Sequence, residues 1–261
     1  GMLREESEPL KGRRWTLAPN APPPPEDALD FARARISQVT DPTRLRALRL
    51  LALSGPGTPE TVMVSVAGEA MDLVVVDGLV ELSSGLPSLD MPELAKAALE
   101  GLTDDDARAA LHIELADAWS AENETPRVTS RIGAHLFASG QRAASLIPLD
   151  RALRGLHQTL PVPELRALAE MTLAAADAAD AKGSRAWVHA AMLLADAAWR
   201  QGSSDLAQAL DGELAKADLQ PGARVRAACA AARRRGPSDR GLLADLEPLK
   251  NQMVNIPGHL S

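Results

Sequence analysis

The sequence predicts a mainly α-helical fold built of antiparallel helix pairs, and three observations support this prediction. Of the 261 residues, 46% are hydrophobic but only 2% are aromatic, with two Phe and no Tyr. Alanine and leucine must therefore form the core, which favours closely packed helices over a sheet sandwich. Apolar residues recur at helical spacing along most of the chain, and Gly or Pro separates each such stretch from the next. Short connections of this kind place neighbouring helices antiparallel.

Residues 1–25 form the first of three predicted segments. Arg13 to Leu17 has the composition of a short strand, the second arm of a hairpin in one interpretation, and Pro22 to Pro25 form a stiff linker. A segment this small cannot form its own core. It either docks on the next domain or is the remnant of a domain that lay upstream.

Residues 26–102 are predicted to form a small, mainly helical domain. Helices are expected at residues 26–39, 43–53, 58–67 and 91–102. Leu29, Ala32, Ile36 and Val39 share one face of the first of these helices, and Leu94, Ala98 and Leu102 share one face of the last. In the third, Thr58 is the expected N-cap and Pro59 the first helical residue.

Residues 69–90 allow two interpretations. In one, Leu73–Val76 and Leu79–Leu82 are strands joined by a two-residue turn at Asp77–Gly78. In the other, a short helix from Ala70 ends at Gly78, and a strand, a wing and a return strand follow. We favour the second, because the preceding helices need a packing partner of that size. Helices that lead into such a segment make a winged-helix-like domain.

Residues 103–261 are predicted to form a tetratricopeptide-like α-solenoid of antiparallel helix pairs. The best match to a tetratricopeptide helix pair runs from Leu194 to Leu210. Helices are expected from Thr103 and at residues 126–138, 141–153, 164–182, 185–201, 205–217, 223–235 and 239–252. The inward-facing residues are expected to be Leu111, Leu115, Ala118 and Trp119 in the first of these helices and Ala144, Ile147 and Leu149 in the third.

The order of these segments resembles the region downstream of the ATPase in bacterial signal-transduction NTPases, such as LuxR-type regulators and ATPase-linked serine/threonine kinases. The motifs that carry the resemblance are Gly12-Arg13-Arg14-Trp15-Thr16-Leu17-Ala18-Pro19, Gly78-Leu79-Val80, Pro92-Glu93-Leu94 and Arg108-Ala109-Ala110-Leu111-His112. The chain departs from that family in lacking a Gly-x-x-x-x-Gly-Lys-Ser/Thr phosphate loop. The resemblance therefore implies a sensor region without its ATPase, either a fragment of a larger protein or a paralogue that lost the motor.

The sequence predicts no catalytic residue, no cofactor site and no metal site. Asp77 follows a run that is similar to a Walker-B strand, but without a phosphate loop a Mg²⁺ ion would have no phosphate to bridge. Asp104, Asp105 and Asp106 point in different directions on a helix and suit its first turn. The five histidines contain no His-x-x-x-His pair, and we expect His112 and His135 to be partly buried polar contacts between helices.

Nucleic-acid binding is the competing hypothesis, with the chain as a DNA-binding winged-helix transcription regulator. The net charge of −7 and the pI near 5.3 argue against a nucleic-acid surface over the whole molecule. The helix expected to read DNA, residues 69–77, contains three acids and no Lys or Arg. Phosphates would repel it, so packing against another protein domain is the better interpretation.

One basic cluster is a candidate partner-binding surface: Arg224, Arg226, Arg233, Arg234 and Arg235, with Arg240 close behind. The simpler interpretation, which we place first, is a solvated face near the end of a helix, where cations suit the helix dipole. The functional interpretation is a contact for an acidic protein partner.

Together these observations predict a non-catalytic protein-interaction and regulatory module of a bacterial signal-transduction or transcription-regulatory ATPase. Its partner would be another protein or the attached ATPase domain, bound through the helical repeats. No apolar run is long enough to span a bilayer and the start lacks a secretory signal, so a cytoplasmic location is expected.

Overall fold

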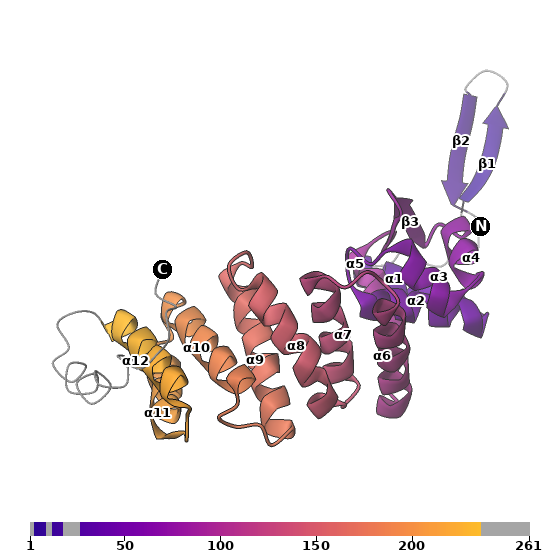
Figure 1. Cartoon of the computed structure of the whole chain (residues 1–261). Helices are drawn as coiled ribbons and strands as arrows, with labels where there is room; N and C mark the ends of the chain where they lie inside the picture. The colour runs from indigo at the N-terminus through magenta and orange to yellow at the C-terminus, as the bar shows by residue number, and fades with distance from the viewer. Residues whose placement is uncertain (1–2, 9–11, 18–26, 236–261) are drawn as a thin grey trace. The chain divides into compact units, whose positions relative to one another are not determined.

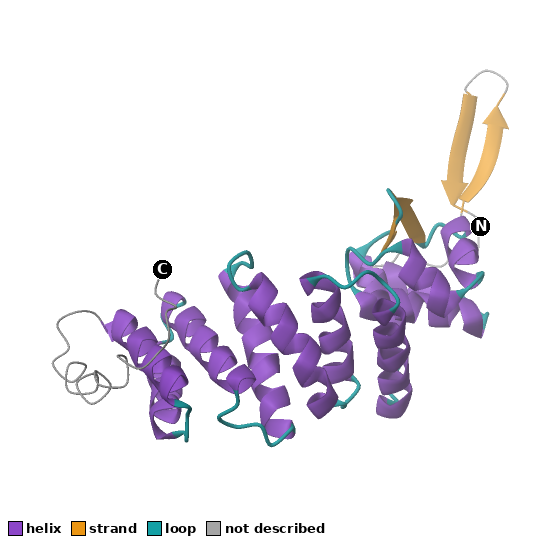
Figure 2. Cartoon of the chain, in the orientation of Figure 1, coloured by secondary structure: helices purple, strands orange, loops and turns teal. Residues whose placement is uncertain are grey.

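The computed structural model describes residues 3–8, 12–17 and 27–235. Within these ranges the chain is mainly α-helical, with twelve helices and two antiparallel two-stranded sheets (Figures 1 and 2). Consecutive helices pack in pairs, which confirms the predicted fold class at this level. The chain divides into two compact units, Gly1–Thr103 (unit 1) and Asp104–Ser261 (unit 2). The helix predicted at residues 239–252 lies outside the described residues.

Strands β1 (Leu3–Glu8) and β2 (Gly12–Leu17) form an antiparallel hairpin. Leu3 lies opposite Leu17, and Glu8 lies opposite Gly12. The strand predicted before the proline linker is therefore present as the second arm of a hairpin. The linker, Pro22 to Pro25, lies outside the described residues.

Helices α1 (Ala28–Ser37) and α2 (Pro42–Ser54) each begin behind an aspartate. Asp27 Oδ1 accepts a hydrogen bond from the amide of Asp30 at 2.8 Å, and Asp41 Oδ1 accepts one from Thr43 at 2.8 Å. These side chains satisfy amides that the first helical turn leaves without a partner.

The prediction that Thr58 caps the third helix is wrong. Helix α3 (Glu60–Ala67) has Pro59 at its N-cap position and no side-chain cap. The Thr58 side chain is buried, and its hydroxyl donates to the carbonyls of Gly55 at 2.9 Å and Ser54 at 3.3 Å. Thr58 therefore satisfies carbonyls left over at the end of α2 rather than amides at the start of α3.

Residues 70–89 follow the favoured interpretation: helix α4 (Ala70–Val76), then strands β3 (Val80–Ser83) and β4 (Leu86–Leu89). A two-residue turn at Asp77–Gly78 of the common hairpin type would need positive φ at both residues. Only Gly78 has positive φ, at 66°, whereas Asp77 is helical at −70°. The residues with paired positive φ are Ser84 and Gly85, which join β3 to β4.

Helix α5 (Pro92–Glu100) completes unit 1 and packs against α1 and α2. All three residues of the predicted stripe are buried: Leu94 and Ala98 on α5, and Leu102 just after the helix ends. On α1 only Ala32 of the predicted stripe is fully buried, while Leu29 and Ile36 are half-buried. Val39, also half-buried, lies after the end of α1. The largest fully buried side chains of unit 1 include Leu48, Leu50, Met63, Val74 and Leu94.

Unit 2 is a succession of seven helices within the described residues: α6 (Asp105–Ser120), α7 (Pro126–Ala138), α8 (Arg142–Leu156), α9 (Val162–Ala178), α10 (Arg185–Arg200), α11 (Ser204–Lys216) and α12 (Pro221–Arg235). Each helix packs against the next, and Figure 1 shows α6 to α10 side by side in chain order. The core that runs from α8 to α12 is rich in alanine, as the composition predicted.

The inward faces of two helices test the predicted stripes. On α6 the predicted residues Leu111, Leu115, Ala118 and Trp119 are all buried. On α8 Leu149 is buried, but Ala144 is exposed and the Ile147 side chain is 65% exposed. The buried face of α8 is instead Ser145, Leu149, Ala152 and Leu153. Ser145 can lie in the core because its hydroxyl donates to the carbonyl of Arg142 at 2.6 Å.

No helix in the described ranges combines the length and the hydropathy needed to cross a bilayer.

Candidate functional site

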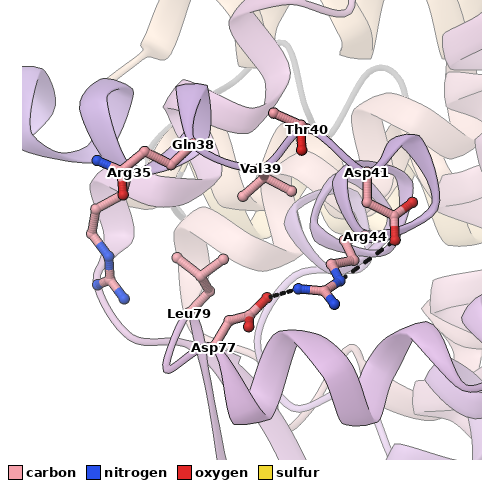
Figure 3. A pocket seen from close by; sticks show the side chains of 8 residues that line it. All are labelled: Arg35, Gln38, Val39, Thr40, Asp41, Arg44, Asp77 and Leu79. Atoms are coloured by element: carbon pink, nitrogen blue, oxygen red, sulfur yellow. Dashed lines mark hydrogen bonds and ion pairs between the residues drawn. The ribbon is translucent and has the colours of Figure 1, made fainter.

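A pocket of about 460 Å³ in unit 1 lies where α1 ends, α2 begins and α4 turns into β3 (Figure 3). Arg35 Nη1 lies 2.7 Å from Asp90 Oδ2, and its Nη2 donates to the carbonyl of Gly78 at 2.6 Å. Arg44 Nη1 lies 2.6 Å from Asp77 Oδ2, and its Nε lies 3.5 Å from Asp41 Oδ2. The charged groups of this pocket therefore neutralise one another and join α1 and α2 to the end of α4.

These contacts also give Asp77 a structural role. The sequence places Asp77 where a Walker-B carboxylate would stand, but in the structure its carboxylate binds the guanidinium of Arg44. Figure 3 shows both side chains directed toward each other across the pocket.

A second pocket, of about 640 Å³, lies within unit 2 and is lined by α8, α10, α12 and the connections before α10 and α12. We call it the arginine pocket and define it by its five titratable residues: Asp150, Arg154, Arg185, His189 and Arg226. Val188, Met192 and Ala223 form its apolar wall. The volume is within the range of about 300–1,000 Å³ that is usual for ligand pockets.

The arginine pocket carries unbalanced positive charge. It has three guanidinium groups and one carboxylate, hence two net positive charges when His189 is neutral. Arg154 Nη2 lies 2.8 Å from Asp150 Oδ2, four residues before it on α8. Arg185 and Arg226 have no hydrogen-bond or ion-pair partner among the residues that the structure describes. This is the opposite of the unit 1 pocket, where the arginines are paired.

Two polar atoms beside this pocket are buried without a hydrogen-bond partner in the described part of the chain: Asp150 Oδ1 and His189 Nδ1. Burial lowers the pKa of His189, and the neighbouring imidazole of His157, whose ring centroid is 5.7 Å away, lowers it further. The carboxylate of Asp150 raises the pKa of His189, whereas Arg154 and Arg185 each lower it by a small further amount. The lowered pKa favours the neutral form of His189, so the positive charge of the pocket comes from the arginines.

The predicted arginine cluster is not one surface. Arg226 lines the arginine pocket, whereas Arg224 is exposed about 200° away around the same helix. Arg233 is also exposed. Arg234 points into unit 2, where it forms ion pairs with Asp196 of α10 and Asp211 of α11. The side chain of Arg235 and all of Arg240 lie outside the part of the chain that the structure describes.

Arg234 must therefore be removed from the candidate partner contacts. Its side chain is only 4% exposed, so it holds α12 against the two preceding helices and cannot meet a partner. The sequence alone did not separate it from its neighbours, because five arginines within twelve residues appear on every side of a helix.

The other candidate residues have structural roles. Asp104 is the N-cap of α6 and accepts from the amides of Asp106 and Ala107, while Asp105 and Asp106 lie in the first turn. His112 and His135 form the predicted contact between helices, with their Nδ1 atoms 3.0 Å apart on α6 and α7. In the described ranges no group of three or more His, Cys, Asp or Glu could hold a metal ion.

Sequence reasoning missed Asp150, Arg154, Arg185 and His189, because each helix contributes only one or two titratable residues to the pocket. One signal was available on α10, where Arg185, Val188, His189 and Met192 follow helical spacing on one face. Two polar residues inside such an apolar stripe indicate a lined pocket rather than a closed core.

Comparison of the chain with protein-family models, with curated proteins and with solved structures gives no significant match. The resemblance to the region downstream of signal-transduction ATPases stays a prediction.

Proposed function

We propose that this chain is a non-catalytic protein-recognition and regulatory module whose unit 2 binds a protein partner. The observation that supports this proposal is the arginine pocket, in which Arg185 and Arg226 stand unpaired around an apolar wall. Guanidinium groups left unpaired on a scaffold of packed helices are suited to bind an acidic group from outside. Such a pocket recognises a molecule without transforming it.

The finer assignment of the fold belongs to the same proposal. Unit 1, with α4 followed by the β3–β4 hairpin, is taken as a winged-helix-like domain, and unit 2 as a tetratricopeptide-like array. In such arrays each helix pair offers side chains to a bound partner while its neighbours fix their positions. The partner would be a separate protein or an ATPase domain, whose activity the bound state would regulate.

DNA binding remains a second candidate, because a strand hairpin directly after α4 is the arrangement that winged-helix proteins use. The chemistry of α4 argues against it. Glu69 and Asp72 are exposed at its start, and the Val76 side chain at its end is 83% exposed. An acidic and apolar surface is repelled by phosphates and offers no donor to base edges.

Site-specific photo-crosslinking of the full chain tests the proposal. A photoreactive amino acid replaces Gln220, which lines the arginine pocket, or Gln208, an exposed residue of α11 away from it. After irradiation in an extract of the native cells, we expect a discrete protein adduct from position 220 and none from position 208. If neither position gives an adduct, or both give the same ones, the pocket does not recognise a protein.

A further inference from the structure

We infer that the arginine pocket binds a short acidic peptide segment in which a carboxylate side chain stands next to an apolar one. This inference deepens the proposed function and depends on it, since it names the chemistry of the partner segment. Three features of the pocket support it: its charge, the helix ends that surround it, and its apolar wall.

The positive charge of the two unpaired arginines favours an anionic ligand. Arg185 and Arg226 come from different helices, α10 and α12, and both line one cavity without an acidic partner in the described ranges. Two like charges that share a cavity repel each other, and a carboxylate between them would remove that repulsion. An Arg–carboxylate contact can also form two parallel hydrogen bonds, which fixes the orientation of the ligand.

The N-termini of α10 and α12 also favour an anionic ligand. Arg185 is the first residue of α10, and neither α10 nor α12 has an acidic residue in its first turn. Helix N-termini carry partial positive charge and are stabilised by anions, so Arg185 stands at an unfavourable position unless an anion joins it. Gly183 and Gln220, which come just before these two helices, also line the pocket. Both helices thus begin at the pocket that contains the unpaired arginines.

The remaining lining favours a carboxylate over phosphate. Asp150 lines the same pocket, and only one of its carboxylate oxygens is paired with Arg154. Phosphate would bring up to two negative charges toward this aspartate, whereas a carboxylate brings one. Val188, Met192 and Ala223 form a wall that inorganic phosphate cannot cover. A peptide can occupy both the charged side and the apolar wall of the pocket. Its Asp or Glu side chain would contact the arginines, and a Leu- or Met-like side chain would pack on the wall.

The test uses the purified full chain and two fluorescent hexapeptide pools. In the first pool two positions are fixed as Glu and one as Leu, and in the second the Glu positions are Gln. We expect the acidic pool to bind at least about tenfold more tightly than the neutral pool, measured by fluorescence anisotropy. We also expect Arg185→Gln and Arg226→Gln each to weaken acidic-pool binding by roughly tenfold.

Arg224→Gln is the matched control, because it removes the same charge from the same helix on a face that does not line the pocket. It should change the affinity by less than about twofold, since salt screens an exposed charge that lies outside the pocket. Arg226→Lys keeps the charge but loses the planar guanidinium, so it should bind the acidic pool more tightly than Arg226→Gln does and less tightly than the unaltered chain. Circular dichroism and thermal unfolding confirm that each variant is folded.

Three results would overturn the inference. These are no binding of the acidic pool, equal loss in the Arg224 and Arg226 variants, or displacement of the peptides by inorganic phosphate at the peptide's own concentration. The last result would assign the pocket to phosphate. If the crosslink at position 220 captures a protein while the peptide test fails, the proposed function stands and only the acidic segment is excluded.

Discussion

Arg234 shows how a single charged side chain can join three helices. It extends from α12 into the interior of unit 2, and its guanidinium binds Asp196 on α10 and Asp211 on α11. The side chains of Arg234 and Asp211 are each only 4% exposed, so both charges have been taken out of water. A buried pair adds little net stability when it is compared with apolar residues, but removing one partner leaves a buried charge without compensation.

Arg234→Met should therefore destabilise the protein by about 3 kcal/mol, because Asp211 loses its only ion-pair partner in the described part of the chain. Arg233→Met, at the adjacent exposed position, should change the free energy of unfolding by less than about 0.5 kcal/mol. Urea unfolding followed by circular dichroism measures both. Equal effects of the two substitutions would show that the ion pairs with Asp196 and Asp211 contribute nothing to stability.

The histidine pair is a second residue-scale feature with a measurable consequence. Because the two Nδ1 atoms are 3.0 Å apart, one ring must donate and the other accept, so at least the accepting ring must be neutral. Burial lowers the pKa of His135 to about 4, and the neighbouring His112 and Arg131 lower it in the same direction. Burial also lowers the pKa of His112, with a smaller contribution from Arg108.

The pH dependence of stability follows from these shifts. In the unfolded chain His135 takes up its proton near pH 6.5, but in the folded chain only near pH 4. Between these values the unfolded state binds more protons, so stability falls as the pH is lowered through this window, by about 3 kcal/mol in total for this group. Urea unfolding at several pH values should show a shallower decline for His135→Gln than for the unaltered chain. Parallel declines would contradict the assignment to His135.

At the scale of elements, α7 and α8 approach closely at a glycine. A Cβ atom added to Gly133 on α7 would lie 2.7 Å from Leu149 Cδ2 and 3.1 Å from the Leu149 amide nitrogen. The absence of a side chain therefore lets the two helices come together over Leu149, a fully buried residue of α8. Small residues permit this kind of packing, which the alanine-rich composition predicts for the whole unit.

Gly133→Ala should destabilise the protein by about 1–3 kcal/mol, because Leu149 and the α8 backbone must move to make room. Gly212→Ala on α11 is the matched substitution, since nothing lies within 4 Å of the added Cβ. It should stabilise the protein by roughly 0.5–1 kcal/mol through the higher helix propensity of alanine. Thermal unfolding of the two variants measures both effects. Higher stability in both variants would contradict the close approach of α7 and α8 at Gly133.

The element scale also shows what the sequence can and cannot predict. The helix positions were predictable because local chemistry marks them, as Asp104 does at the start of α6 and Gly140 does after α7, where its φ is 84°. The inward face of α8 was misassigned because Ile147 is apolar yet exposed, while the polar Ser145 is buried. Only packing against α7 and α9 decides which face of α8 turns inward.

The complete set of residues in the arginine pocket could not be predicted from the sequence, for a related reason. Its members lie as far apart in the chain as Asp150 and Arg226, and the packing of α8, α10 and α12 brings them to one cavity. Arg226 was part of the predicted cluster, but its neighbours Arg224 and Arg234 point in other directions. A run of charges along the sequence therefore does not identify a site when the helix turns by about 100° at each residue.

At the scale of the whole molecule, the distribution of charge distinguishes the two proposed functions, protein recognition and DNA binding. The chain carries a net charge of −7, while the arginine pocket of unit 2 carries positive charge that its own residues do not balance. A negative surface with a small positive cavity favours a ligand that brings one or two carboxylates. A DNA duplex instead presents a continuous array of phosphates that needs an equally extended basic surface.

The full chain should therefore show no steep dependence of duplex affinity on salt. A protein with six to ten phosphate contacts loses about 10³–10⁵ in affinity between 50 and 200 mM salt, whereas a protein with one or two such contacts loses less than about tenfold. Glu69→Lys with Asp72→Lys reverses two exposed charges on α4, and gained affinity in this variant would show that only charge keeps α4 from DNA. A steep slope in the unaltered chain, measured by anisotropy of a labelled duplex, would favour the transcription regulator over the protein-recognition module.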